Sequence, residues 1–496
     1  MDFSRASGVL LHPTSLPGPN GIGELGPEAF RWIDWLADAG SALWQVLPLG
    51  PTSYGDSPYQ CFSAFAGNPY LISFDRLLAD GLLHANDLRD RPDFNPDWVD
   101  FGTIYDWKLA VLDRAFGQFK SGEVADLHSR VKTFAAENAH WLPDYALFMS
   151  IKDAQGGSPW WEWPDDLKLR DPDAVAAARE TYAGSIEKHN FLQYLFAVHW
   201  QDVRTYAHSR GVRIVGDIPI FVAYDSSDVW ANPALFHLDE QGRRTVQAGV
   251  PPDYFSATGQ LWGNPLYRWK VHKASGYAWW FERLRSVLSQ VDILRLDHFR
   301  GFYDYWEIPG DALTAQNGRW VLGPGADFFV NLRETLGELP IIAEDLGELH
   351  PKVYELRDRF DLPGMKILVF AFGDEHPNIF IPYNYTANTV VYTGTHDNDT
   401  ALGWFRRVSE KERDLARRYL ARDGSDIAWD LVREAWSSVS ALALAPLQDL
   451  LGLGNEARMN LPGTVGTHNW SWRVRAEAFS PGLQARLREA NFLYGR

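Results

Sequence analysis

The chain has 496 residues and carries 47 Lys and Arg against 64 Asp and Glu, a formal net charge of −17 at pH 7. Hydrophobic residues make up 46% of it, enough to fill a large core, which excludes a disordered chain. A chain this acidic, with no basic cluster evident in its sequence, repels phosphate groups, so neither nucleic acid nor a membrane is expected as a partner.

The amino-terminal segment does not predict export. The apolar stretch at 9–11 is stopped by His12 and Pro13, far short of a signal-peptide core. The longest apolar runs, such as 367–372, are too short to cross a bilayer, which takes about 20 apolar residues. The single cysteine, Cys61, excludes an internal disulfide and fits a reducing compartment. We therefore expect a cytoplasmic protein.

Eight short apolar segments predict β-strands that are buried on both faces. Each is continuously hydrophobic and ends in polar or glycine-rich residues, as in a parallel sheet covered by helices. The segments are 8–11, 42–49, 212–221, 292–299, 339–347, 365–373, 388–399 and 441–450. Helix-like segments alternate with them. The sequence therefore predicts an α/β fold in which eight strands close into a (β/α)8 TIM barrel.

Three of the helices can be placed from their ends. A helix over 27–39 begins with proline and is followed by Gly40. Another opens at Asp171, which has proline as its next residue, and the helical segment 189–211 ends at a glycine. Short helices between buried strands are what a barrel of this kind requires.

The strand spacing is uneven, because roughly 160 residues separate the second strand from the third, far more than a crossover helix needs. We expect one catalytic barrel over 1–496 with an inserted, mostly helical subdomain at approximately 55–210. Within it, 160–172 is expected to be irregular. A second irregular region, 250–267, is rich in Gly, Pro and aromatic residues. Such regions often serve as lids, so a lid loop is predicted at approximately 245–270.

Acidic residues follow several of the predicted strands. Four of them fall at or just past a strand's C-terminal end: Asp217, Asp297, Glu344 and Asp397. In a barrel all these ends open on one face, the face that carries the active site. The structural alternative for any one of them is a helix cap or a turn, which aspartate often provides. Four together favour an active site.

Two of these carboxylates predict glycosidase chemistry. Arg295 and Asp297 are two residues apart, so on a strand they point the same way and the guanidinium favours the ionised carboxylate. Asp297 is thus a candidate nucleophile, with a structural ion pair as the alternative. Glu344 follows the next barrel strand and suits a proton donor if its pKa is raised. Carboxyl groups on neighbouring strands can lie about 5–5.5 Å apart, the separation of a retaining enzyme with a covalent intermediate.

The sequence contains partial signatures of two other kinds of site, one for a metal and one for a dinucleotide. His396, Asp397 and Asp399 could serve as metal ligands, but no HExxH motif, cysteine cluster or EF-hand spacing accompanies them, and no metal is expected. The segment 451–457 fits a dinucleotide pattern, but Pro462 follows where a long helix should continue. No cofactor is therefore expected.

Several aromatic residues lie in polar loops, although most of the 22 tryptophans are expected in the core. The loop residues would be exposed unless a ligand stacks on them, and the apolar faces of sugar rings suit that contact. They are Tyr54, Tyr59, Tyr254, Phe255 and Trp262.

Eight sequence strings resemble a known family. They are HPTSLPGPNGIGELG at 12–26, WQVLPLGPTSYGDSPYQ at 44–60, GDIPIFV at 216–222, PPDYFSATGQLWGNPLY at 251–267, RLDHFRG at 295–301, AEDLG at 343–347, YTGTHDNDT at 392–400 and NLPGT at 460–464. In this order they resemble the 4-α-glucanotransferases of glycoside hydrolase family 77, the amylomaltases of the α-amylase clan. The resemblance runs from about residue 8 to residue 473. It implies a (β/α)8 barrel with inserted subdomains and no C-terminal β-sandwich.

The resemblance also implies roles for individual residues. Asp297 matches the family's nucleophile, Glu344 its general acid/base and Asp397 its transition-state-stabilising aspartate. Tyr254 and Phe255 match residues on a lid over the acceptor side. The full set of positions matching substrate-binding residues is Tyr59, Asp217, Tyr254, Phe255, Trp262, Arg295, His298, Asp374 and His396.

Together, residues and resemblance predict a 4-α-glucanotransferase that moves an α-1,4-glucan segment to the 4-hydroxyl of an acceptor glucan. The expected partners are maltooligosaccharides, amylose or other α-1,4-glucans, and the chain is expected to be a monomer or a weak homo-oligomer. Two alternatives stay open at this point. One is a hydrolytic α-glucanase of the same clan. The other is a non-catalytic glucan-binding protein, which would need the aromatic residues but no carboxylates at strand ends.

Overall fold

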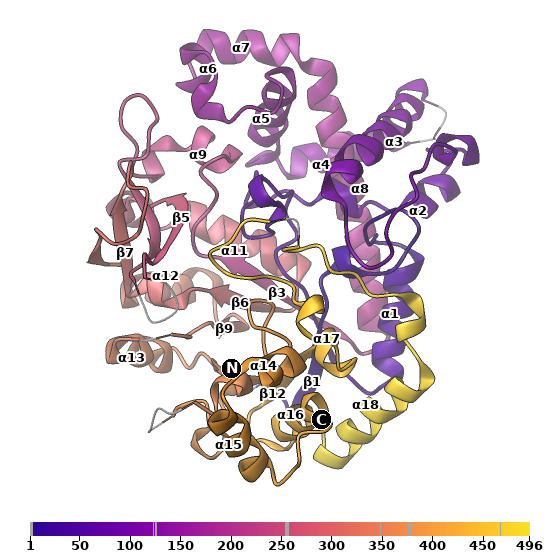
Figure 1. Ribbon diagram of the computed structural model, residues 1–496. Helices are drawn as coiled ribbons and strands as arrows, with labels where there is room; N and C mark the ends of the chain where they lie inside the picture. Colours follow the sequence, from indigo (N-terminus) through magenta and orange to yellow (C-terminus); the bar gives the residue numbers. More distant parts are fainter. Residues whose placement is uncertain are drawn as a thin grey trace.

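The computed structural model describes residues 3–122, 124, 126–252, 257–347, 349–373, 378–466 and 468–496, apart from the side chain of Tyr54. Three predicted binding residues, Tyr254, Phe255 and Asp374, lie outside the described residues. Figure 1 shows helices arranged around a set of central strands, with α5, α6 and α7 at one end of the molecule. None of the described helices is both long and apolar enough to cross a membrane.

Eight parallel strands close into a barrel. They are β1 (Ala6–Leu10), β2 (Leu43–Gln45), β3 (Arg213–Pro219), β6 (Ile293–Asp297), β9 (Ile341–Ala343), β10 (Gly364–Ile367), β11 (Thr389–Tyr392) and β12 (Leu442–Pro446). Their order around the barrel is β1-β12-β11-β10-β9-β6-β3-β2, and β2 pairs back with β1. Each predicted segment overlaps one of these strands, so the predicted fold class is confirmed.

Burial explains the composition of the strands. β1 and β12 are buried along their whole length, which matches their continuous hydrophobicity. β1 approaches β2 so closely that a Cβ atom at Gly8 would lie 2.5 Å from the Cβ of Leu43, and glycine is needed there. Several strands are shorter than predicted because the last residues of the segments leave the sheet. β11, for example, ends at Tyr392, and the residues after it form a loop on the C-terminal face.

The helices cover the barrel and build the region between β2 and β3. They are α1 (Pro27–Asp38), α2 (Phe74–Ala79), α3 (Phe101–Ser121), α4 (Leu127–Glu137), α5 (Leu142–Ala154), α6 (Asp165–Lys168), α7 (Pro172–Thr181), α8 (Ala183–Ser209), α9 (Ser227–Ala231), α10 (Trp269–Ala274), α11 (Ala278–Gln290), α12 (Ala326–Leu336), α13 (Pro351–Arg359), α14 (Ala401–Arg407), α15 (Glu410–Leu420), α16 (Ile427–Ser437), α17 (Leu447–Leu450) and α18 (Pro481–Tyr494). The predicted helix over 27–39 is α1. Asp171 caps α7 by accepting hydrogen bonds from the N–H groups of Asp173 and Ala174.

The chain between β2 and β3 contains α2 to α8, and buried charges tie it to the barrel loops. α8 packs against both α5 and α1. The ammonium of Lys108 on α3 is fully buried and donates to Glu24, in the loop that follows β1. Lys152 on α5 donates to Asp225, which follows β3, at 2.6 Å. These pairs hold the inserted helices against the loops at the barrel's C-terminal face.

Two segments predicted to be irregular have regular structure. The range 160–172 contains a 3-10 turn at Trp160–Glu162 and α6. Both are too short to show a helical period in the sequence. The range 250–267 contains all of β5, one strand of a small antiparallel sheet.

The small sheet has the order β5-β4-β7-β8 and was not predicted. Its strands are β4 (Val246–Val250), β5 (Gln260–Pro265), β7 (Asp304–Pro309) and β8 (Arg319–Leu322). Glycine and proline interrupt the hydrophobic pattern of the first two, and the register shifts between Gln247 and Gly249. The sheet also joins segments on either side of β6 in the chain, a pairing that local sequence does not reveal.

The chain after β12 comes back to the amino-terminal part of the fold. α18 packs against α1 and α16. In the described residues beyond β12 we find helices, loops and one isolated bridge between Trp98 and Trp472, and no C-terminal β-sandwich.

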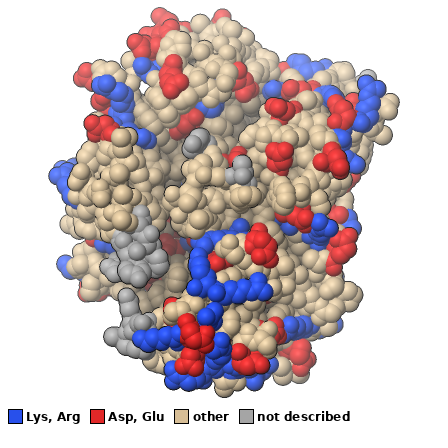
Figure 2. All heavy atoms as spheres, viewed as in Figure 1, with Lys and Arg blue, Asp and Glu red and all other residues tan. Residues whose placement is uncertain are grey.

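Charged side chains of both signs are interspersed over the surface, but not evenly. Figure 2 shows one continuous patch of Lys and Arg near α14, in the lower centre of that view. The patch was not apparent from the sequence. The arginines of neighbouring α15 are compensated locally, since Arg417 pairs with Glu410 at 2.7 Å and Arg418 with Asp414 at 2.8 Å.

The buried pair in α3 gives a stability prediction. Lys108→Met should destabilise the fold by about 3–5 kcal/mol, because it removes the cation that pairs with the largely buried carboxylate of Glu24. Urea unfolding followed by tryptophan fluorescence measures this. The control is Arg418→Met, which breaks an exposed pair and should cost less than about 1 kcal/mol. Equal effects for the two variants would contradict the prediction.

Candidate active site

The predicted acidic residues gather at the C-terminal ends of neighbouring barrel strands. β3 carries Asp217, β6 ends at Asp297, and Glu344 comes directly after β9. β6 lies between β3 and β9, so these three side chains come from adjacent strands. Asp397 lies in the loop that follows β11.

A buried arginine joins two of the carboxylates. In the barrel register Arg295 lies directly opposite Asp217. Its Nη1 donates to both oxygens of Asp217, at 2.9 and 2.7 Å, and lies 2.9 Å from Oδ1 of Asp297. The side chains of Arg295 and Asp217 are 4% and 0% exposed, whereas Asp297 is 27% exposed. Asp217 is thus the buried partner of the arginine, whereas the carboxylate of Asp297 stays partly accessible.

Tyr59 reaches this cluster from the loop after β2. Its hydroxyl donates to Oδ2 of Asp217 at 2.9 Å. Its ring stacks on His396, with centroids 5.1 Å apart and planes 15° apart, and Trp470 packs against both rings. The tyrosine therefore connects the β3 carboxylate with the loop that carries Asp397.

Glu344 is partly buried and held by main-chain groups. Oε2 accepts a hydrogen bond from the N–H of His298 at 2.7 Å, and Oε1 accepts one from the N–H of Leu346 at 3.1 Å. His298 adopts a left-handed conformation, φ 53°, at the turn between β6 and the segment that follows it. Burial raises the pKa of Glu344 to about 8, and the nearby charge of Asp297 acts in the same direction. At neutral pH this group can carry a proton.

Asp297 has opposing influences on its charge. Burial raises its pKa, and the charge of Asp397 adds to that rise, while the guanidinium of Arg295 lowers it. A charge-assisted contact at 2.9 Å is the strongest favourable one available to the carboxylate. The arrangement favours an ionised Asp297 beside a protonated Glu344.

Asp397 is more exposed than Asp297, since 43% of its side chain is accessible against 27%. Its Oδ1 accepts a hydrogen bond from the amide of Asn460 at 2.7 Å and lies 3.4 Å from Nε2 of His396. Burial lowers the pKa of His396, so this imidazole is neutral near pH 7. The amide of Asn460, rather than the ring of His396, therefore makes the short polar contact with the Asp397 carboxylate.

Trp262 and His298 form a second part of the site. The Trp262 ring meets the His298 ring edge to face, with centroids 4.9 Å apart. Among the described residues, the buried Nε2 of His298 has no hydrogen-bond partner. Burial lowers the pKa of His298 to about 4, so a neutral imidazole nitrogen is free to bond to a ligand hydroxyl.

The comparisons with known proteins agree with this geometry. A family model described as 4-alpha-glucanotransferase, that of glycoside hydrolase family 77, matches residues 11–478. The chain belongs to this family. It is 50% identical to a 4-alpha-glucanotransferase of Thermus thermophilus, covering 98% of both chains, and 50% identical to one of Synechocystis, covering 99% of this chain and 98% of the other.

Solved structures of amylomaltases share the fold. The amylomaltase of Streptococcus agalactiae, solved in complex with acarbose, superposes with a TM-score of 0.96 at 42% identity over 99% of each chain. The amylomaltase of Corynebacterium glutamicum superposes with a TM-score of 0.79 at 19% identity, covering 98% of this chain and 75% of that chain. The protein is thus an enzyme of the 4-α-glucanotransferase class, and a non-catalytic glucan-binding protein or a hydrolase is not favoured.

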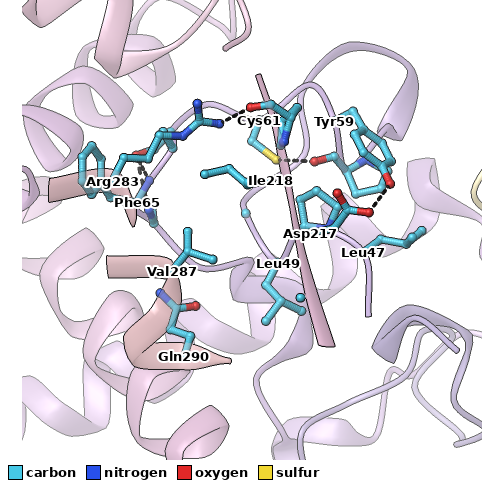
Figure 3. Close-up of a pocket in the computed structure, with 18 of the residues that line it drawn as sticks. Leu47, Leu49, Tyr59, Cys61, Phe65, Asp217, Ile218, Arg283, Val287 and Gln290 are labelled. Atoms are coloured by element: carbon cyan, nitrogen blue, oxygen red, sulfur yellow. Dashed lines mark hydrogen bonds between the residues drawn. The ribbon is translucent and has the colours of Figure 1, made fainter. Parts of the chain in front are cut away.

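A cavity in this 4-α-glucanotransferase lies behind the carboxylate cluster rather than in it. It measures about 70 Å³, well below the roughly 300 Å³ at which ligand sites begin. Figure 3 shows Arg283, Val287 and Gln290 on one side of it and Cys61 and Tyr59 on the other. Burial raises the pKa of the Cys61 thiol to about 12, so the thiol is unreactive. The cavity is a packing space between the barrel wall and α11.

The structure brings most of the predicted site residues together. The described members that share contacts are Tyr59, Asp217, Trp262, Arg295, Asp297, His298, Glu344, His396 and Asp397. Sequence reasoning missed three neighbours. Asn460 binds Asp397, Trp470 packs on Tyr59, and His12, whose pKa burial lowers, lies close enough to His396 for that histidine's charge to lower it further. Asn460 and His12 are each the first residue of a string that carries the family resemblance. Their place in these strings was the signal from which they could have been found.

The bond between Tyr59 and Asp217 gives a second prediction. Tyr59→Phe keeps the stack on His396 but removes one donor from a buried carboxylate, and should lower kcat/KM for transfer from maltotriose by roughly tenfold. The matched control is Tyr206→Phe, which removes a similar bond to Asp34 on the surface and should leave the rate unchanged. A Tyr59→Phe variant as active as the unmodified enzyme would show that the bond is dispensable.

Proposed function

We propose that the enzyme transfers an α-1,4-glucan segment from a donor such as a maltooligosaccharide or amylose to the 4-hydroxyl of an acceptor glucan, with retention of anomeric configuration. One observation supports this most strongly. Asp297 lies 2.9 Å from the guanidinium of Arg295, which favours its ionised form, while burial raises the pKa of Glu344, directly after the neighbouring strand, to about 8. One charged and one protonated carboxyl group are what double displacement requires.

In the first step, a carboxylate oxygen of Asp297 attacks the anomeric carbon of the donor. The bond from that carbon to the glycosidic oxygen breaks, and Glu344 transfers its proton to the departing oxygen. The donor's reducing-end fragment leaves, and a glycosyl ester with Asp297 remains. The predicted separation of about 5–5.5 Å between the two carboxyl groups stays a prediction.

In the second step, Glu344 is a carboxylate and acts as the base. It takes the proton of an acceptor's 4-hydroxyl, the oxygen attacks the anomeric carbon, and the ester bond to Asp297 breaks. Glu344 is protonated again and Asp297 is again ionised. The sum is one α-1,4 bond broken and one formed, with no cofactor.

Asp397 is the proposed stabiliser of positive charge on the sugar in both transition states. It lies in the loop after β11, with 43% of its side chain exposed, and is close enough to influence the charge of Asp297. A fixed negative charge near a developing oxocarbenium ion lowers the barrier without further rearrangement.

The remaining polar and aromatic groups are proposed to bind glucose units. Tyr59 and Trp262 offer ring faces, and the nitrogens of His298 and His396 suit hydroxyl groups. The relative from S. agalactiae was solved with acarbose, which supports a glucan-like ligand for this site.

From the resemblance, we also propose that the segment between β4 and β5, with Tyr254 and Phe255, covers the acceptor side and favours acceptor sugar over water. The same resemblance gives Asp374 a substrate contact. We propose a cytoplasmic location, on the ground that the one cysteine, Cys61, is a free thiol.

Maltotriose tests the proposed reaction. The unmodified enzyme should form maltotetraose and longer products with little net gain in reducing ends, measured by anion-exchange chromatography. Asp297→Asn should lose at least roughly a thousandfold in rate, because no nucleophile remains. Asp358→Asn on α13, an exposed carboxylate paired with Arg357, is the matched control and should be fully active. Production of glucose and maltose without longer products would refute transfer.

The pKa shifts predict a bell-shaped pH profile for kcat/KM. Activity should fall on the acid side as Asp297, whose pKa burial raises, takes up a proton and ceases to be a nucleophile. It should fall on the basic side above about pH 8, as Glu344 loses the proton that the leaving oxygen needs. Initial transfer rates between pH 4 and 10 measure both limbs. Full activity at pH 10 would contradict the role of Glu344.

A further inference from the structure

Asp397 is supported by a part of the chain that no strand of the barrel provides. The residues that hold it lie at 458–460, beyond β12. Arg458 donates through Nη2 to the main-chain oxygen of Asp397 at 2.6 Å, and through Nε to the main-chain oxygen of Asn460 at 2.7 Å. The N–H of Asn460 donates to the main-chain oxygen of His396 at 3.1 Å. The two segments are thus locked together through their backbones.

These contacts fix where the Asp397 main chain lies, but they leave the direction of its carboxylate open. With 43% of the side chain exposed, packing does not restrict its rotation much. The short contact that does so is the bond from the Asn460 amide to Oδ1, at 2.7 Å. His396 lies at 3.4 Å from the same oxygen and is neutral, because burial lowers its pKa.

We propose that Asn460 is a positioning residue for the reaction: its side-chain amide aims the Asp397 carboxylate at the sugar. The inference rests on the proposed function, in which Asp397 stabilises the transition state. A charge contributes fully to catalysis only when it is held in place before the reaction, since otherwise reorganisation costs free energy in each turnover. Asn460 is 9% exposed, so water does not readily take over its role.

The side chain and backbone of Asn460 can be tested separately. The main-chain groups of Asn460 make the contacts with Arg458 and His396, and these survive substitution of the side chain. In the described structure, the bond to Asp397 is the hydrogen bond that its amide makes. Replacing the amide therefore removes the bond to the Asp397 carboxylate and leaves the main-chain contacts with Arg458 and His396 in place.

The principal variant is Asn460→Ala. We expect kcat for maltotriose transfer to fall roughly 10- to 100-fold, the worth of a hydrogen bond to a charged group, with KM within about twofold of the unmodified value. The isosteric Asn460→Asp should be at least as slow, because a carboxylate replaces the donor. The matched control is Asn455→Ala, which removes an amide bond of 2.9 Å to Asp399 in the same segment and should keep kcat.

Three results would overturn the proposal. They are a kcat for Asn460→Ala within twofold of the unmodified enzyme, a KM that rises while kcat is retained, and a fall in Tm of more than about 5 °C, which would indicate a structural role. A double variant with Asp397→Asn gives a fourth criterion. If Asn460 acts through Asp397, adding Asn460→Ala should slow Asp397→Asn no further, whereas full additivity would refute the link.

The same set of variants distinguishes a failure of this proposal from a failure of the proposed function. If Asp397→Asn transfers as fast as the unmodified enzyme, the role given to Asp397 is wrong, whatever Asn460→Ala does. If Asp397→Asn is slow and Asn460→Ala is not, the role of Asp397 stands and only the positioning role of Asn460 falls.

Discussion

The charge balance around Arg295 is the interaction on which the site depends. Burying an ion costs several kcal/mol unless a partner compensates it, and here one buried guanidinium contacts both Asp217 and Asp297. Without it, two carboxylates on adjacent strands would face each other across a few ångströms, and both would favour the protonated form. Tyr59 supplies a further donor to Asp217. Asp217 and Tyr59 therefore determine how much of the arginine's charge is available to Asp297.

The same balance favours different protonation states for the two carboxyl groups that take part in the reaction, Asp297 and Glu344. Glu344 lies beyond the next strand, where it receives main-chain N–H groups from His298 and Leu346 and no direct contact with the guanidinium is seen in the described structure. Burial dominates there and, together with the charge of Asp297, it outweighs the opposing charge of Arg295, so the pKa of Glu344 is raised. One fold thus produces an ionised and a protonated carboxyl group from similar side chains, through the strand on which each is placed.

The sequence was informative wherever local pattern controls structure. Continuous hydrophobic runs located all eight barrel strands, and the two-residue spacing of Arg295 and Asp297 predicted their contact. Pairings between distant segments were not accessible in this way. The hydroxyl of Tyr59 meets a carboxylate 158 residues later. The small sheet joins β4 and β7 across β6, and nothing local to either strand specifies that partner.

The three carboxylates differ in what fixes their positions, and one of them depends on chain beyond the last barrel strand. Asp297 lies on a strand and Glu344 directly after one, so the barrel register sets their positions. Asp397 lies in a loop and depends on groups 61 and 63 residues further along the chain, after the last strand. A chain ending at β12 would close the barrel but leave this carboxylate without support. The family model matches residues 11–478 and so includes the segment 458–460 that supports Asp397.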